Sequence, residues 1–211
     1  MKRMKEIDVK ALFAFVADVI DIETIPLDDQ KTYNLLARAD TDGVYMMETD
    51  WDKYDLLQIQ PKDFDELTAC VALSHNPRMN PYIYTYLKIL KVQPFTFPRF
   101  SEIDAVRDIL KDSHGMLLYK EQAEDISYHI ASMSEEDKKE HAMAIKILIR
   151  EIEKRKGTLS ERTFFRDRAL FCYKNAFIKA NHPVLFNAFI ASHVLDSYGI
   201  RNHGVGSTDH F

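Results

Sequence analysis

The chain has 211 residues, of which 46% are hydrophobic and 29% charged, and its formal net charge is −5. This composition is typical of a globular protein with a sizeable core, and the acidic balance disfavours a dedicated nucleic-acid binder. A membrane protein is excluded because no run of about 18 apolar residues occurs, and the basic start lacks the apolar segment of a secretory signal. We therefore expect a cytoplasmic protein.

Helix signals dominate the first half of the chain, where Gly is scarce. The dense apolar pattern of residues 8–20 predicts a buried helix. Asp28 and Asp29 are placed to cap a helix over residues 30–38, and Asp63 opens the next helix with Glu66 three residues on. Between these helices, residues 43–48 (GVYMME) are the best candidate for a short extended piece or hairpin.

The second half continues in the same way. Asn80-Pro81 opens a helix over residues 82–91, and the two prolines of residues 92–100 mark an irregular connector. Caps and stop signals then predict four more helices: from Ser101 and Asp104 to Gly115, from Ser134 and Asp137 to Gly157, from Ser160 to about Asn181, and from Pro183 to Gly199. Residues 201–211 are expected to form a flexible tail.

Metal and catalytic sites are weakly supported by the residues alone. The Asp-x-Asp pairs Asp40/Asp42, Asp50/Asp52 and Asp63/Asp65 have the spacing that two-metal nucleotidyl transfer uses, but none follows an apolar strand. We interpret them as turn and helix-start residues. The eight histidines show no i, i+4 pairing, and no Gly-rich phosphate loop occurs. We expect no catalytic residues, no metal site and no cofactor. Cys70 and Cys172, in apolar helical patterns, are expected to be buried and reduced.

Charge is unevenly distributed along the chain. Residues 18–66 hold 14 Asp/Glu and 4 Lys/Arg, whereas residues 134–179 hold 12 Lys/Arg and 8 Asp/Glu. Within the basic part, Lys139, Lys146, Arg150 and Lys154 are spaced to form one stripe on the predicted long helix. The opposite, core-facing side is predicted to contain Ala142, Ile145, Leu148, Ile149 and Ile152. The stripe is either a solvated face or a nucleic-acid-binding surface that contacts phosphates.

Several segments resemble, in order and spacing, the fingers region of the bacterial DNA polymerase III alpha subunit, a C-family replicative polymerase. The segments span roughly residues 7–190 and are IPLDDQKTYNLLARADTDGVYMMET, LTACVAL, DILKDSHGMLLYKEQ, HAMAIK and ALFCYKNAFIKANHP. In that family an upstream palm domain supplies the catalytic aspartates and the fingers grip the incoming nucleotide. Domains that bind duplex DNA and the sliding clamp follow.

Many positions of the family pattern are retained: Asp28, Asp29, Gly43, Val44, Glu48, Gly115, Tyr119, Glu121, Gln122, Ala142, Met143 and Lys146. Others depart from it. A Tyr-Arg-Pro-Gly-Pro run falls on residues 74–78, two phosphate-facing arginines fall on Glu140 and His141, and an Asn-Lys-Ser-His run falls on residues 161–164. A Gln is replaced by Met46 and another by Lys120.

The resemblance therefore implies a vestigial nucleotide-binding set: Glu48, His75, Tyr119, Lys120, Glu121, Gln122, His141, Lys146 and Arg162. A nucleoside triphosphate needs fixed cations and donors. Each lost cation should cost about 1–3 kcal/mol of binding free energy. The scaffold is expected to persist and the nucleotide grip to be lost.

We conclude from the sequence that the protein is all-α, with a single multi-helix fingers-like domain over residues 1–200. The first hypothesis is a non-catalytic module associated with DNA replication or nucleic-acid binding. The alternatives are the fingers component of a split polymerase with its palm on another chain, and a protein-interaction module that keeps only the fold. Expected partners are DNA, bound weakly and non-specifically, or another replication protein or polymerase chain. The initial Met and polar tail favour a complete chain, and the oligomeric state is left open.

Overall fold

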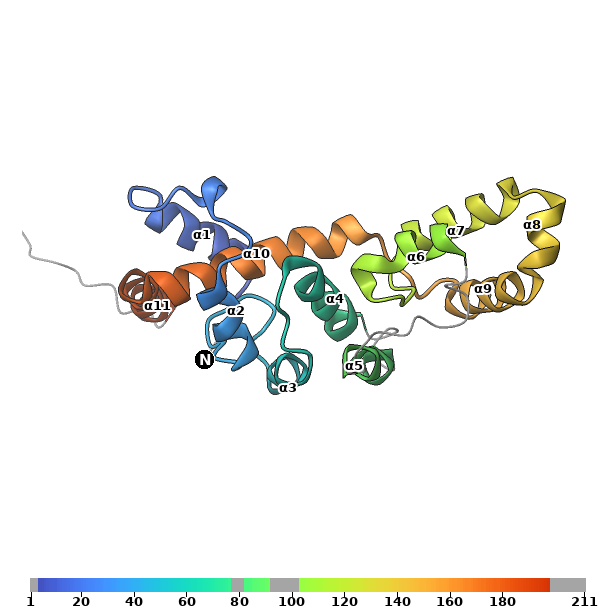
Figure 1. Ribbon diagram of the computed structural model, residues 1–211. Coiled ribbons are helices and arrows are strands. Elements are labelled where there is room, and N and C mark those ends of the chain that lie inside the picture. The colour runs from blue at the N-terminus through green and yellow to red at the C-terminus, as the bar shows by residue number, and fades with distance from the viewer. Residues whose placement is uncertain (1–3, 77–81, 92–102, 198–211) are drawn as a thin grey trace, which may run out of the picture.

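The computed structural model describes residues 4–76, 82–91 and 103–197, and these residues form helices joined by turns (Figure 1). The only β-pairing within these ranges is an isolated bridge between Tyr119 and Ser160. The all-α prediction is confirmed. The α-helices are α1 (Glu6–Val16), α2 (Gln30–Ala37), α3 (Asp50–Ile59), α4 (Phe64–His75), α5 (Ile83–Lys91), α6 (Asp104–Leu110), α7 (Lys120–Ser132), α8 (Glu135–Glu140), α9 (Ala142–Arg155), α10 (Arg162–Asn181) and α11 (Pro183–Ser197).

Helix α10 is the central element of the molecule. It packs along α2 and α4 and also contacts α1 and α11. Figure 1 shows an elongated arrangement, with α1, α2 and α11 toward one end and α8 and α9 at the other. Two short 3₁₀ turns, η1 (Ile22–Thr24) and η4 (Lys111–Ser113), complete the described elements. No helix within the described ranges combines the length and hydrophobicity needed to cross a bilayer.

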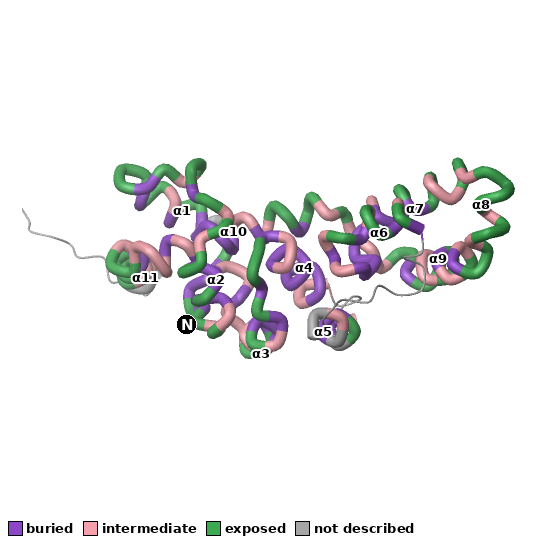
Figure 2. The backbone as a smooth tube through the Cα atoms, in the orientation of Figure 1, coloured by how far each residue is buried: buried purple, intermediate pink, exposed green. Residues whose placement is uncertain are grey.

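The buried side chains form two hydrophobic clusters. The larger cluster draws on α1 to α5, α10 and α11, and includes Leu36, Leu67 and Tyr173. The smaller cluster joins α6, α7 and α9 through eight buried residues: Ile103, Val106, Leu110, Leu117, Ala123, Ile126, Ala144 and Leu148. The partly buried Leu159 contacts both clusters. Figure 2 shows α8 largely exposed beyond the smaller cluster.

Side-chain caps fix where the helices of the larger cluster begin. The Asp29 carboxylate accepts a hydrogen bond from the Thr32 amide at 2.8 Å, and Asp63 accepts from the Glu66 amide at 2.8 Å. Each cap satisfies an amide that has no partner within its own helix. Both caps agree with the sequence prediction. Glu66 departs from the reciprocal capping box, because its carboxylate accepts from the Lys62 amide instead.

Several local predictions are wrong. Residues 43–48 form turns rather than a hairpin, with Gly43 at φ +76° and Met46 at φ +63°. The apolar helix expected to reach residue 20 ends at Val16, and the helix expected from Ser160 begins at Arg162.

The long helix expected up to Gly157 is divided at His141 into α8 and α9. Helix α8 buries no residue, so no packing holds it in line with α9. The bend lets α9 pack against α7. The core-facing side of α9 is also rotated from the prediction, because Ala144 and Arg155 are buried while Ala142 and Ile149 are exposed.

Some predicted signals fall outside the described residues. These are Asn80-Pro81, residues 92–100, Ser101, Gly199 and the tail at 201–211.

Candidate functional site

The starts of α7 and α10 bring several of the sequence-predicted residues together. Both Glu121 carboxylate oxygens lie 2.9 Å from the backbone nitrogen of Arg162, the first residue of α10. A carboxylate at this position satisfies an unpaired amide and interacts favourably with the positive end of the helix dipole. Glu121 therefore stabilises the packing of the start of α10 against α7.

The Arg162 guanidinium is held between two carboxylates. Its Nη2 donates to Asp65 Oδ1 at 2.9 Å and to Asp112 Oδ2 at 3.0 Å. Arg166, one turn along α10, donates to the same Asp65 oxygen at 3.0 Å. The cluster of Asp65, Asp112, Glu121, Arg162 and Arg166, here called the acid–arginine cluster, contains three carboxylates and two guanidinium groups. Its positive charges are therefore already neutralised within the protein.

Tyr119 and Gln122 are buried beside this cluster. Burial raises the pKa of the Tyr119 phenol, whose ring lies 5.6 Å from the Arg162 guanidinium carbon. The Gln122 side-chain oxygen accepts from the amides of Leu118 and Tyr119 at 2.9 and 3.1 Å. Its nitrogen donates to Ser113 Oγ at 2.7 Å. These hydrogen bonds connect the loop before α7 to η4, so both residues have structural partners.

Lys120 lies next to these residues but faces solvent. Its ammonium group is 3.4 Å from Glu124, one turn along α7, and both side chains are more than half exposed. Such exposed pairs hold a side chain weakly. Lys120 is therefore accessible to an anion, whereas the charge of Arg162 is already paired with Asp65 and Asp112.

Glu48 and His75 lie elsewhere, around the loop between α2 and α3. Glu48 accepts from the Gly43 amide at 2.9 Å and from the Met4 amide. His75 Nε2 donates to the Met46 carbonyl at 2.6 Å and lies 3.2 Å from Asp52 Oδ1. Burial opposes ionisation of Asp52, but hydrogen bonds from His75 and Thr49 lower its pKa overall. Both residues stabilise the loop.

The predicted basic stripe is interrupted. Lys146, Arg150 and Lys154 are exposed on one face of α9, while Lys139 belongs to α8 on the other side of the bend at His141. His141 is half-buried at that bend. Within the described part of the chain, none of the three α9 cations forms an ion pair. Their face gathers three exposed cations of the predicted set on a single helix.

The aspartate pairs are engaged in structural contacts. Lys179 binds Asp40 at 2.8 Å and Lys53 binds Asp42 at 2.6 Å. Asp52 contacts His75, and Asp63 caps α4. Asp65 binds Arg162 and Arg166. Asp50 is exposed in the first turn of α3. Among the residues that the structure describes, no group of three or more His, Cys, Asp or Glu could hold a metal ion.

Cys70 and Cys172 are free and buried, and burial raises the pKa of both thiols.

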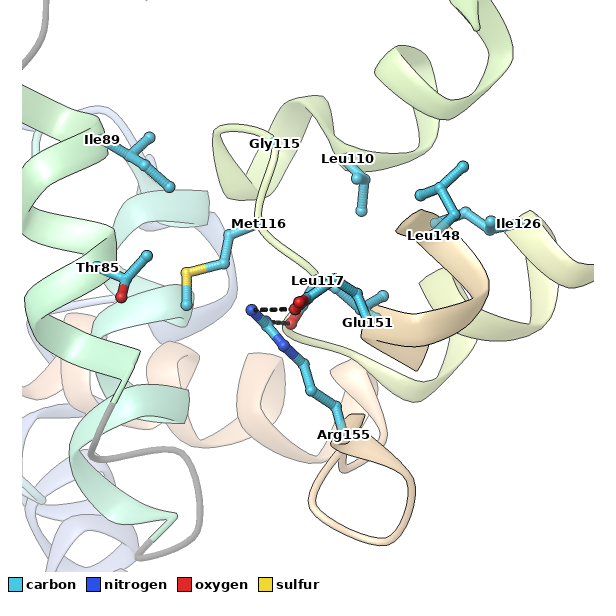
Figure 3. A pocket seen from close by; sticks show the side chains of 10 residues that line it. All are labelled: Thr85, Ile89, Leu110, Gly115, Met116, Leu117, Ile126, Leu148, Glu151 and Arg155. Atoms are coloured by element: carbon cyan, nitrogen blue, oxygen red, sulfur yellow. Dashed lines mark hydrogen bonds and ion pairs between the residues drawn. The ribbon is translucent and has the colours of Figure 1, made fainter. Parts of the chain in front are cut away.

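A cavity of about 190 Å³ was not foreseen from the sequence (Figure 3). It lies between α5 and the helices of the smaller cluster, and its lining is largely apolar. Figure 3 shows Arg155 reaching to the Leu117 carbonyl and Glu151. The Arg155 guanidinium also stacks 4.3 Å from the Tyr82 ring. No periodicity signals a cation buried at the end of an amphipathic helix, which is why the sequence did not indicate it. The lining residues are Thr85, Ile89, Leu110, Gly115, Met116, Leu117, Ile126, Leu148, Glu151 and Arg155.

Comparison with known proteins adds a family match. The family model described as "Bacterial DNA polymerase III alpha subunit finger domain" matches residues 8–167. Among curated proteins, the DNA polymerase III subunit alpha of Staphylococcus aureus (strain N315) is 32% identical over 122 residues. The protein of the same name from Staphylococcus epidermidis is 31% identical over 122 residues. Each alignment covers 54% of this chain and 10% of the relative, so the chain spans about a tenth of the length of these relatives.

Proposed function

Since the chain belongs to the family of bacterial DNA polymerase III alpha subunit finger domains, we propose that it is a replication-associated fingers module that has kept the helical scaffold and lost the nucleotide grip. In this proposal the module makes no catalytic contribution by itself. It acts through contacts with nucleic acid or with another protein of the replication machinery.

The observation that carries the proposal is the neutralisation of Arg162. A nucleoside triphosphate approaching this cation has to displace Asp65 and Asp112, which lie 2.9 and 3.0 Å from the same guanidinium nitrogen. Hydrogen bonds to charged groups contribute about 1.5–3 kcal/mol each, so the displacement is costly. With three carboxylates and two guanidinium groups, the acid–arginine cluster repels a polyanion.

The positions that match the phosphate-facing arginines of the family support the same proposal. They are occupied by Glu140, the last residue of α8, and by His141. Glu140 adds negative charge where the family places positive charge, and an imidazole lacks the permanent charge and the five-donor fork of an arginine.

Calorimetric titration with each dNTP and Mg²⁺ tests the proposal. We expect no binding in the micromolar range, and no primer extension with Mg²⁺ or Mn²⁺ by the purified chain. A micromolar dissociation constant that weakens when Arg162 is changed to Gln contradicts the proposed loss of the nucleotide grip, whereas affinity that is insensitive to this change comes from elsewhere in the chain. Primer extension that disappears when Asp40/Asp42 or Asp63/Asp65 are changed contradicts the non-catalytic assignment.

Nucleic-acid contact is assigned to the exposed cations of α9. Lys146, Arg150 and Lys154 share a face opposite the buried Ala144 and Leu148. Three cations that each neutralise one phosphate give a log–log salt slope of about −2.7 on duplex DNA. The acidic α2–α4 region keeps such binding weak, with a dissociation constant no tighter than about 10 μM near physiological salt.

A protein partner is the second candidate, because of the surface of α3. Trp51, Tyr54 and Leu57 are 78%, 55% and 47% exposed and recur every three residues along the helix. Exposed aromatic residues are enriched at protein interfaces. A polymerase palm on another chain is one such partner.

Trp51 is the single tryptophan of the chain. Its fluorescence on titration with a purified palm domain therefore reports contact directly, and unchanged emission contradicts an interface at α3.

A further inference from the structure

A second cleft lies at the end of the molecule opposite α9, between α2 and the junction of α10 with α11. Its volume is about 410 Å³, within the range of small-molecule sites. Helix α2 contributes Lys31 and Asn34, and its C-cap residue is Arg38; the spacing of three and four residues puts the three on one side. The α10–α11 junction contributes Lys179, Pro183 and Asn187 on the facing side.

The cleft carries net positive charge in an otherwise acidic region. Its lining includes three cations and one carboxylate, Asp40. Asp40 is already engaged, since Lys179 Nζ lies 2.8 Å from Asp40 Oδ1 and 2.9 Å from the Asp40 carbonyl. Lys31 and Arg38 are exposed and make no ion pair within the described part of the chain. Residues 18–66 contain only four Lys or Arg, and two of them line this cleft.

The remaining lining groups also suit an anion. The amides of Asn34 and Asn187 offer hydrogen-bond donors and acceptors. Pro183 begins the 15-residue helix α11, whose first-turn amides give this side of the cleft a partial positive charge. An Arg fork, a Lys ammonium and two amides together match the oxygens of a phosphate group and the polar groups of an attached sugar or base.

We propose that this cleft binds the phosphate group of a nucleotide, either free or within a nucleic-acid strand. The inference does not rest on the proposed function. The α10–α11 junction is far along the molecule from the acid–arginine cluster and from α9 (Figure 1). Evidence for or against phosphate binding in this cleft therefore leaves the proposed loss of the nucleotide grip unchanged.

Nuclear magnetic resonance of the full ¹⁵N-labelled chain tests the proposal, with three separate probes: inorganic phosphate, adenosine monophosphate and a short oligo-dT strand. We expect saturable shifts of the amides of residues 31–38 and 179–187. The double variant Lys31→Gln, Arg38→Gln should weaken this binding at least about tenfold, since it removes two charge-assisted contacts. Lys62→Gln is the matched control, because Lys62 is an exposed lysine of the same acidic region that lies outside the cleft.

The probes distinguish the source of the phosphate. Tighter binding of oligo-dT than of the mononucleotide, with the same shifted amides, identifies a strand as the ligand, and the reverse order identifies a free nucleotide. The proposal is overturned if none of the three probes shifts the cleft amides, or if the folded double variant binds as well as the Lys62→Gln control. Circular dichroism confirms folding, which should be unaffected because Lys31 and Arg38 are both exposed.

Discussion

At the scale of single residues, a side chain at a position of the family pattern does not necessarily have the role that the family gives to that position. Glu121, Gln122 and Arg162 stand at positions that the family resemblance connects with nucleotide binding, yet here each has partners inside the protein. Glu121 holds the start of α10, and Gln122 holds the loop before α7. Arg162 is the most informative, because its charge is present but neutralised by Asp65 and Asp112.

Releasing Arg162 should restore part of the anion affinity. We predict that the double change Asp65→Asn, Asp112→Asn lowers the dissociation constant for a triphosphate at the acid–arginine cluster at least about tenfold, since two competing charge-assisted hydrogen bonds are weakened. Calorimetric titration with dATP and Mg²⁺ measures the change. Asp108→Asn, which removes an exposed carboxylate of α6, is the control and should leave the affinity unchanged. Equal affinities for the double variant and the control would show that internal neutralisation is not what prevents binding.

The His114–Glu66 pair makes stability depend on pH. The hydrogen bond with Glu66, at 3.1 Å, raises the pKa of His114 even though burial opposes it. A raised pKa means that the pair's stabilisation is fully present below the unfolded His value of about 6.5 and is lost as the pH rises through the folded value. We predict a His114 midpoint above about 6.5 by nuclear magnetic resonance titration. In Glu66→Gln the midpoint should fall, and stability should decline less between pH 6 and 8.

Glu124→Gln serves as the control for this titration, because Glu124 is exposed and pairs only weakly with Lys120. The same His114 midpoint in wild type and Glu66→Gln would rule out Glu66 as the cause of the raised pKa.

At the scale of helices, the sequence predicted most of the helices, although it missed α3 and α7 and misplaced several helix ends. The Asp29 and Asp63 caps and the α10 helix followed from local chemistry, and the structure has them. The division of α8 from α9 did not, because it depends on packing against α7 rather than on a local stop signal. The same applies to the acid–arginine cluster, which unites residues up to 101 positions apart in the chain. No spacing rule reveals such pairs.

The exposed face of α9 gives a prediction at this scale. Lys146→Glu with Arg150→Glu should abolish weak, sequence-independent DNA binding, because two of three cations become repulsive. The fold should persist, since both side chains are exposed and the buried face contains Ala144 and Leu148. Fluorescence anisotropy with labelled duplex DNA at several salt concentrations measures the effect. The wild-type log–log slope of affinity against salt concentration should be about −2.7. If the folded variant binds DNA as strongly as the wild type, this face is only a solvated surface.

At the scale of the whole molecule, the two hydrophobic clusters differ in size. Among the described residues, the larger contains 34 buried members and the smaller eight. Polar contacts between the two parts include Glu121 with the start of α10, Arg162 with Asp112, His114 with Glu66, and the bridge between Tyr119 and Ser160. The composition indicated a sizeable core, but it could not show that the core is divided. The division depends on which helices pack against α10 and which do not.

A divided core predicts unequal local stability. Burial of apolar surface dominates stabilisation, so the α6–α7–α9 unit should open more readily than the part built on α2, α4 and α10. Native-state hydrogen exchange is expected to show less protection for the amides of α9 than for those of α4. Leu148→Ala should enlarge this difference, because removing a side chain that is only 3% exposed costs about 2–5 kcal/mol.

Leu36→Ala in the larger cluster is the matched change, since Leu36 is fully buried in α2. If the two clusters unfold separately, Leu148→Ala lowers protection in α6, α7 and α9 and leaves the middle of α10 protected. Leu36→Ala then lowers protection in α2, α4 and α10. Equal loss of protection throughout the chain in both variants would instead mean that the contacts around Glu121 and Arg162 couple the two clusters into one cooperative unit.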